Sequence, residues 1–188
     1  MNKKTMLIIA GPNGAGKTTF APFLHDFYEI EESVNPDIIA EGLSLNPQSV
    51  AFHSGRIALV RIQQLIENQI SFAYETTLAS HTVRHMISHS HRDNYHIRLH
   101  FLALPSAGFA KQRVKYRVSQ GGHDIPENTI ERRFKRGIRN FFDYYQHQVD
   151  EWVLYDALNN HEVIAFRSNN STTIILSDNY RRLESHYD

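Results

Sequence analysis

A glycine-rich stretch near the start of the chain has the residue types that hold a nucleoside triphosphate. Its glycines let successive backbone N–H groups converge on phosphate, and the start of the helix that follows favours negative charge. Lys17 can reach the β and γ phosphates, and the Thr18 hydroxyl can bind Mg²⁺. The stretch therefore predicts a phosphate loop for ATP or GTP with magnesium. Its residues are Gly11, Pro12, Asn13, Gly14, Ala15, Gly16, Lys17, Thr18 and Thr19.

Two carboxylates follow the next predicted strands. Asp37 lies 20 residues beyond Lys17, and Glu75 is followed by Thr76 and Thr77. Carboxyl ends of parallel strands share one edge of a sheet, so both acids are expected beside the phosphate loop. Asp37 could take or orient the proton of an acceptor hydroxyl, while Glu75, with Thr76, could bind substrate or hold Mg²⁺ through water. Helix capping is an alternative that stays open at both places, with Asp37 as part of a helix start and with Thr76 or Thr77 starting the next helix.

A basic segment lies between Lys111 and Arg139 and carries nearly half of the positive charge of the chain. Guanidinium groups on a closing segment can stabilise the phosphoryl group during transfer. Two helices joined by GGHDIP could form such a lid, with Gly121 and Gly122 as its hinge. Arg117, Arg132 and Arg133 are the candidates for phosphate contact, with Arg133 preferred over Arg132. A solvated helix face is expected for Lys111, Lys115, Lys135 and Arg139.

Strand and helix patterns alternate along the chain and would position these groups. Strands are expected at 6–10, around 28–37, 71–77, 95–104 and 152–158, and helices at 17–27, 48–69, 81–91, 106–120 and 127–149. HEVIAF and TTIILS predict a closing hairpin. This order predicts an α/β, three-layer P-loop NTPase fold of the nucleoside-kinase type, with a mainly parallel sheet, helices on both faces and a helical lid. We expect one domain, 1–188, with the lid at about 111–139.

Composition excludes several function classes. The chain has 188 residues, no cysteine, and 20 basic against 20 acidic side chains. Cysteine chemistry is therefore excluded, and bulk charge attracts neither nucleic acid nor an acidic membrane. The apolar run at the start is too short for a signal peptide, and no segment approaches the length of a membrane span. A cytoplasmic protein is expected.

The sequence lacks motifs that two classes of nucleotide-binding protein, ABC ATPases and GTPases, normally contain. No apolar strand ending in Asp-Glu follows a signature loop, as an ABC ATPase requires, and no Asn-Lys-x-Asp guanine reader marks a GTPase. Three interpretations remain: a kinase of a small hydroxylated molecule, a polynucleotide or nucleoside kinase, and a nucleotide-binding regulatory module without kinase activity. Zero net charge argues against a nucleic acid acceptor. A carboxylate such as Asp37 at the phosphate edge argues against a pure binding module.

In this order, GPNGAGKTT, NPDIIA, YETTL and RVKYRVSQGGHDIPENTIERRF resemble the zeta-toxin-like family of P-loop kinases, in its short chromosomal form. The resemblance spans roughly residues 5 to 160. It implies transfer of a phosphoryl group from ATP or GTP to a hydroxyl of UDP-N-acetylglucosamine, and a small antitoxin as partner. By this resemblance Asp37 matches the catalytic base, Glu75 a substrate-binding acid, and Arg117 with Arg132 or Arg133 the phosphate-gripping arginines.

Overall fold

The structure of the chain is a computed structural model that describes residues 3–43, 47–122 and 124–185. These residues form a seven-stranded sheet in the order β2-β3-β1-β4-β5-β6-β7. Strands β1 to β5 are parallel, and β6 and β7 continue the sheet antiparallel. The strands are β1 Thr5–Ala10, β2 Glu32–Val34, β3 Phe72–Thr76, β4 His96–Ala103, β5 Glu151–Asp156, β6 Glu162–Ser168 and β7 Ser171–Ile174.

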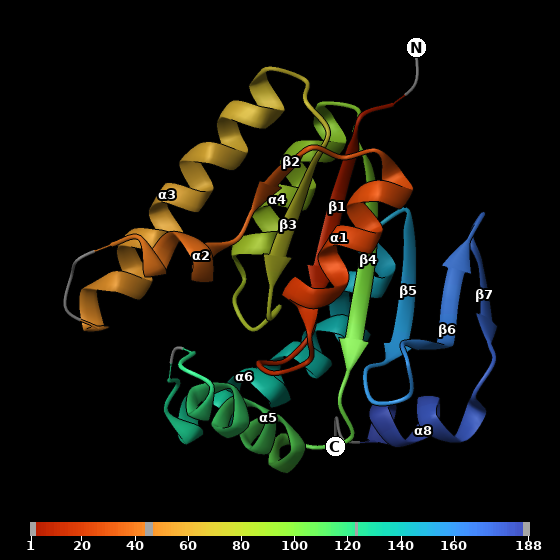
Figure 1. The fold of residues 1–188 in the computed structure, drawn as a ribbon. Coiled ribbons are helices and arrows are strands. Elements are labelled where there is room, and N and C mark those ends of the chain that lie inside the picture. The colour runs from red at the N-terminus through yellow and green to blue at the C-terminus, as the bar shows by residue number, and fades with distance from the viewer. Residues whose placement is uncertain (1–2, 44–46, 123, 186–188) are drawn as a thin grey trace.

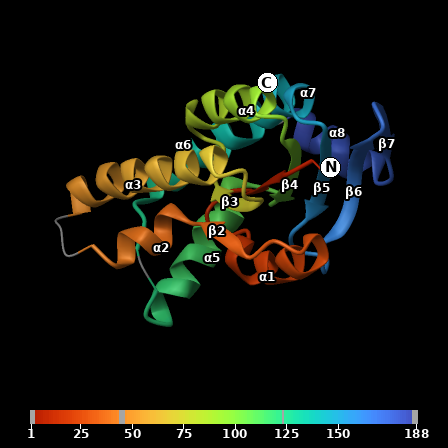
Figure 2. The ribbon, with the colours of Figure 1, turned by 90° about the horizontal axis from the view of Figure 1, so that it is seen from above.

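Helices cover both faces of the sheet and gather at its carboxyl edge. In Figure 2, α1 lies on one side of the strands, and α4 and α7 lie on the other. In Figure 1, α5 and α6 lie at the end to which β1, β3 and β4 point. This arrangement confirms the predicted three-layer α/β fold. The helices are α1 Lys17–Tyr28, α2 Pro36–Glu41, α3 Pro47–Glu67, α4 Thr82–Arg92, α5 Ala107–Ser119, α6 Glu127–Asn140, the π-helix η1 Phe141–Tyr145, α7 Gln146–Gln148 and α8 Ser177–Ser185.

The apolar central strands explain the core. In β1, residues 6–10 are fully buried, because β3 and β4 flank the strand and helices cover its faces. From β1 the chain continues to β2 on one side of the sheet, and from β4 it continues to β5 on the other side. The crevice between the carboxyl ends of β1 and β4 is therefore a topological switch point, where open α/β sheets bind ligands.

The second strand is shorter than the sequence predicted, and this changes the position of Asp37. β2 ends at Val34, so the expectation that Asp37 ends a strand is wrong. The side chain of Asn35 accepts hydrogen bonds from the backbone N–H groups of Asp37 and Ile38, and Pro36 occupies the first helical position. Both features start a helix, so Asp37 lies in the first turn of α2.

Two other elements differ from expectation, and the predicted closing hairpin is present as the antiparallel pair β6 and β7. The predicted helix at 127–149 is α6 followed by a π-helical turn and the short α7. In the closing hairpin the turn is Asn169-Asn170, with φ of 50° and 60°, which suits a tight two-residue hairpin turn. The sequence analysis missed α8, a polar helix that buries Tyr180 and Leu183.

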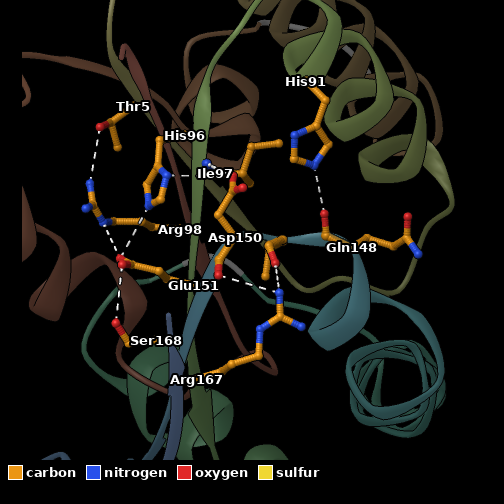
Figure 3. A network of polar contacts seen from close by, with 11 residues as sticks. Thr5, His91, His96, Ile97, Arg98, Gln148, Asp150, Glu151, Arg167 and Ser168 are labelled. Carbon is orange, nitrogen blue, oxygen red and sulfur yellow. Dashed lines mark hydrogen bonds and ion pairs between the residues drawn. The ribbon is translucent and has the colours of Figure 1, made fainter. Parts of the chain in front are cut away.

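A polar network fastens the amino ends of the parallel strands, opposite the carboxyl edge (Figure 3). The Arg98 guanidinium donates to the Glu151 carboxylate at 2.8 Å and to the Thr5 hydroxyl at 3.3 Å. The backbone N–H of Ile97 donates to the Asp150 carboxylate at 2.7 Å. These contacts join the starts of β1, β4 and β5, so this end of the sheet is fixed.

Among residues 3–43, 47–122 and 124–185, no helix has the length and apolar character that a membrane span requires.

Candidate active site

The phosphate loop is closed by its own backbone. The N–H of Ala15 donates to the carbonyl of Pro12 at 3.1 Å, and the N–H groups of Thr19 and Phe20 donate to the carbonyl of Gly16. Gly14 has a φ of 79°, a left-handed conformation that favours glycine. At Gly11 an added Cβ would overlap the carbonyl oxygen of Leu102 in β4. The loop thus needs glycine both for its turn and for its close approach to the neighbouring strand.

Lys17 lies at the start of α1 with its ammonium group folded over the loop. Its Nζ donates to the carbonyls of Gly11 and Pro12 at 3.0 and 3.1 Å. Loss of solvation lowers the pKa of Lys17, while the carboxylates of Asp37 and Glu75 act in the opposite direction. Both predicted acids are therefore close enough to influence the lysine charge.

Glu75 joins β3 to the first turn of α1. It is a buried carboxylate, 5% exposed, and its Oε2 accepts a hydrogen bond from the Thr18 hydroxyl at 3.0 Å. A buried carboxylate is costly unless it is paired, and Thr18 with the nearby Lys17 provides that pairing. The carboxylate and hydroxyl oxygens are ligands that suit Mg²⁺, so the residues present fit a magnesium ion.

Asp37 is exposed, and it lines a cavity together with Glu75 and with Tyr74 of β3. Burial raises the pKa of Tyr74, a hydrogen bond with Thr76 lowers it, and the negative charge of Asp37 raises it further. The Thr76 hydroxyl also accepts from the backbone N–H of Leu78 at 3.1 Å, whereas the next helix begins only at Thr82. The helix-cap alternative for Thr76 and Thr77 is therefore wrong, because a loop separates them from α4.

The candidate arginines reach the cavity from α5 and α6. Arg117 and Arg133 both lower the pKa of Lys17 through their positive charge. Arg133 Nη1 also donates a hydrogen bond to the side-chain Oδ1 of Asn13, a residue of the phosphate loop, at 3.4 Å. Arg132 lines the cavity as well, but it also borders a shallower groove on the outer side of α6. The structure thus places Arg133 closer to the loop than Arg132.

Lys111 is not on a solvated face, so that expectation is wrong. Its ammonium group forms ion pairs with Glu131 at 3.0 Å and Glu127 at 3.6 Å, which ties α5 to α6. Gly121 and Gly122 form the end of α5, where their N–H groups donate to the carbonyls of Val118 and Arg117. Within the predicted lid, His123 lies outside the described residues.

Sequence reasoning missed a cluster of side chains near the phosphate loop and the start of α1, formed by Arg113, His161 and Phe20. Arg113 of α5 lies against the loop, since an added Cβ at Gly14 would meet Arg113 Cβ at 3.0 Å. His161, in the turn between β5 and β6, stacks on Phe20 of α1 with ring centroids 4.3 Å apart. Burial and the charge of Arg113 both lower the pKa of His161. The spacing of these residues along the sequence could not reveal the cluster, because the order of the strands in the sheet brings their elements together.

One open cavity of about 1190 Å³ brings most of these side chains together. Its floor is the phosphate loop with Glu75 and Tyr74, and α2, α3, α5 and α6 form its walls. All the predicted catalytic, substrate-binding and metal-binding residues line it. These residues are Lys17, Thr18, Asp37, Glu75, Thr76, Arg117, Arg132 and Arg133.

Comparison with known protein families gives a match to the Zeta toxin family model over residues 45–182, more than half of the chain. A relative in Haemophilus influenzae, described as an uncharacterized protein, is 26% identical over 129 residues, covering 68% of this chain and 91% of that protein.

Two solved structures share the fold at low sequence identity. The AvrRxo1-ORF1:-ORF2 complex with ATP superposes with a TM-score of 0.80 at 15% identity, over 98% of this chain and 64% of that one. The PezAT chromosomal toxin-antitoxin system of Streptococcus pneumoniae superposes with a TM-score of 0.66 at 12% identity, over 100% of this chain and 89% of that one. This chain therefore spans less than two thirds of the AvrRxo1 chain that it matches. By the family match, the chain belongs to the zeta toxin family of P-loop kinases.

Proposed function

We propose that this chain transfers the γ-phosphoryl group of ATP or GTP to a hydroxyl of a small molecule. The observation that carries the proposal is the convergence, in one cavity, of a phosphate loop, an exposed carboxylate and arginines from two helices. Phosphoryl transfer requires little covalent chemistry from a protein, and it depends on positioning and on stabilising negative charge. This set of groups supplies both.

On the nucleotide side, Lys17 and the loop N–H groups bind the phosphates. Thr18, together with Glu75 acting through water, would hold Mg²⁺, and the ion would neutralise charge on the phosphate oxygens. The remaining loop residues from Gly11 to Thr19 shape the cradle. The nucleotide is ATP or GTP, and dependence on such a nucleotide agrees with a cytoplasmic site of action.

On the acceptor side, Asp37 orients the attacking hydroxyl and accepts its proton. Its side chain is exposed to the cavity, and its electrostatic influence reaches both Lys17 and Tyr74. A carboxylate so placed faces the group that reacts with the γ-phosphoryl. The capping function at the start of α2 belongs to Asn35, which leaves the Asp37 side chain available.

Arg117 and Arg133 stabilise the charge that spreads over the transferred phosphoryl group, with Arg132 as the substitute. They project from α5 and α6, which we propose act as a lid over the site within about residues 111–139. The lid does not include the end of α6, where Asn140 donates to the Leu78 carbonyl at 2.6 Å and fixes the helix to the core. We place the moving part of the proposed lid at the end of α5, around Gly121 and Gly122.

The charge of the cavity supports an anionic acceptor. Seven basic side chains and two carboxylates line it, and a magnesium–nucleotide complex balances only part of the surplus. A UDP-N-acetyl amino sugar carries both hydroxyls and a diphosphate, in agreement with the family resemblance. The basic residues are Lys17, Arg56, Arg113, Arg117, Arg132, Arg133 and Arg136.

We also propose an antitoxin protein as a partner. The Streptococcus pneumoniae relative belongs to a toxin-antitoxin system, and the AvrRxo1 structure is a complex with a second component. Binding of such a partner near the cavity would control access to the site.

The test is incubation of the protein with γ-labelled ATP, Mg²⁺ and one of three acceptors. The acceptors are UDP-N-acetylglucosamine, a small-molecule cell extract and an oligonucleotide with a free 5′-hydroxyl. We expect label in a small molecule whose mass increases by one phosphoryl group. Label only on the oligonucleotide would identify a polynucleotide kinase, and release of inorganic phosphate alone would indicate a nucleotide-binding module.

The control is Lys17→Ala, which keeps the loop backbone but removes the positively charged side chain that binds the β and γ phosphates. Unchanged turnover in this variant would contradict the assignment of the phosphate loop.

A further inference from the structure

Gly55 occupies an unusual position in the middle of α3. It lies well inside the helix and it lines the cavity. A Cβ built on Gly55 meets no heavy atom of the described residues within 4 Å. Packing within the described structure therefore does not require glycine here.

Helix stability does not favour this glycine either. Glycine in a helix interior is less favourable than alanine, because it loses more backbone freedom on folding. Gly137 of α6 is a helical glycine that has a packing reason, because an added Cβ there would overlap the carbonyl oxygen of Thr77. Gly55 has no such neighbour, so the space that it leaves open is a property of the cavity wall.

The neighbours of Gly55 on this wall describe what fills the space. Phe52, Arg56 and Leu59 line the cavity together with Gly55, at the helical spacing that places residues on one face. Phe52 is 63% exposed and Leu59 is 39% exposed, so this face of α3 presents two large apolar side chains to the cavity, as the walls of ligand pockets commonly do. The Arg56 guanidinium lies 5.8 Å from the centre of the Phe52 ring. The open space at Gly55, between Phe52 and Leu59, is thus an apolar notch in the cavity wall, and the Arg56 guanidinium lies beside it.

We propose that Gly55 determines acceptor specificity, by letting a planar ring of the acceptor lie against the α3 backbone between Phe52 and Leu59. Arg56 holds an anionic group attached to that ring, and Asp37 faces the reacting hydroxyl across the cavity. Phe52 offers the ring a stacking surface, since aromatic faces pair in offset geometry. This inference rests on the proposed kinase function, and it adds a residue of α3 that determines which acceptors that site admits.

The test uses Gly55→Ala and Gly55→Leu in the γ-labelled ATP assay with a dilution series of the cell extract. We expect the extract concentration at half-saturation to rise about tenfold for alanine and on the order of 100-fold for leucine, because each fills the notch. The Kd for ATP should stay unchanged. The Tm of the alanine variant should rise by about 2–4 °C, because alanine stabilises the helix.

Gly108→Ala is the matched control. Gly108 is also a helical glycine with room for a Cβ, whose nearest neighbour would be Ser106 Oγ at 3.5 Å, and it does not line the cavity. This variant should also be stabilised, and its half-saturation should equal that of the wild type.

The outcomes separate the two proposals. If the wild type labels a small molecule and the Gly55 variants saturate at the same extract dilution, the role of Gly55 is wrong and the kinase function stands. A labelled product without a planar ring, or without an anionic group besides the new phosphate, also overturns the inference. If the wild type labels no small molecule, both proposals fall.

Discussion

At the scale of single residues, Asp37 illustrates how a local cap can place a functional side chain. Asn35 satisfies the free N–H groups at the start of α2, and Pro36 fixes the first helical residue. Asp37 follows and is exposed to the cavity, within electrostatic reach of Lys17. A carboxylate that capped the helix would be held by hydrogen bonds to the backbone. Because Asn35 caps α2 instead, the Asp37 carboxylate remains available for the proposed contact with an acceptor.

Replacing Asp37 with Asn should therefore separate catalysis from binding. We expect Asp37→Asn to bind nucleotide with an unchanged Kd and to lose phosphoryl transfer by about 10²- to 10⁴-fold, the usual effect of removing a general base. Single-turnover assays and equilibrium titration with a labelled nucleotide measure the two quantities. A collapse of nucleotide affinity would instead identify Asp37 as a ligand of the metal or as a structural residue.

His100 is a second residue whose environment sets its chemistry. It is a buried residue of β4, 3% exposed, and its two ring nitrogens contact the hydroxyls of Tyr28 and Tyr155 at 3.0 and 2.9 Å. Burial, together with the positive charge of Arg98, lowers the pKa of His100 from 6.5 to about 4. The folded protein therefore holds this ring in its neutral form.

The stability of the protein should consequently fall in mild acid. Between about pH 6.5 and pH 4 the unfolded chain binds a proton at His100 and the folded chain does not, so the free energy of unfolding decreases as the pH falls. The contribution of this residue over that range is about 2–3 kcal/mol. Denaturant titrations of the wild type and of His100→Gln at pH 7 and pH 4.5 measure it. If both proteins lost the same free energy, His100 would not be responsible.

At the scale of elements, α5 and α6 present different side chains to the cavity and to each other. Arg117 and Arg133 act on Lys17 from the cavity side, whereas Lys111 pairs with Glu127 and Glu131 and holds the two helices together. Residues on one helix thus divide between catalysis and support. A variant of Lys111 would disturb the position of both helices, so it is unsuitable as a neutral control.

Arg117→Ala and Arg133→Ala should lower kcat by about 10²-fold or more, with little change in the Kd for nucleotide. The reason is that charge on the transferred group develops in the transition state, where these guanidinium groups contribute most. Lys115→Ala, at an exposed position of α5 outside the cavity, is the control and should behave like the wild type. Equal losses in kcat and in nucleotide affinity would mean that the arginines bind the ground state.

The elements also show what the sequence could and could not predict. Periodicity identified β1 and the helix at 17–27, because MLIIA is fully apolar and the glycine-rich stretch has one well-known context. The length of β2 was overestimated, since capping by Asn35 outweighs the strand pattern before it. α8 was missed because only Tyr180 and Leu183 of its nine residues are buried. Contacts such as that between His161 and Phe20 depend on sheet order, which no local pattern contains.

At the scale of the whole molecule, the two edges of the sheet have different properties. The amino edge is fastened by Arg98, Glu151 and Asp150, which join three strands (Figure 3). The carboxyl edge has the cavity and is covered by α5 and α6 (Figure 1). The far end of α6 is tied to the loop after β3 by Asn140 and, through η1, by a hydrogen bond from Tyr145 to the Ser80 carbonyl. The closure proposed for the lid is therefore assigned to the end of α5, around Gly121 and Gly122, rather than to the far end of α6.

This architecture predicts that ligands protect the connection between α5 and α6 from proteolysis. Arg117, Arg132 and Arg133 are trypsin cleavage sites on either side of it, and cleavage requires local opening. Nucleotide and acceptor together should close the segment over the cavity and slow its cleavage, whereas nucleotide alone should protect it less, because the acceptor completes the contacts of the arginines. Limited trypsin digestion followed by mass analysis of the fragments measures the rates. Lys17→Ala should lose the protection, since it cannot hold the phosphates that the arginines meet. Equal cleavage of the 117–133 segment with and without ligands would show that α5 and α6 are a fixed wall, and the proposed lid would be abandoned in favour of a permanently open site.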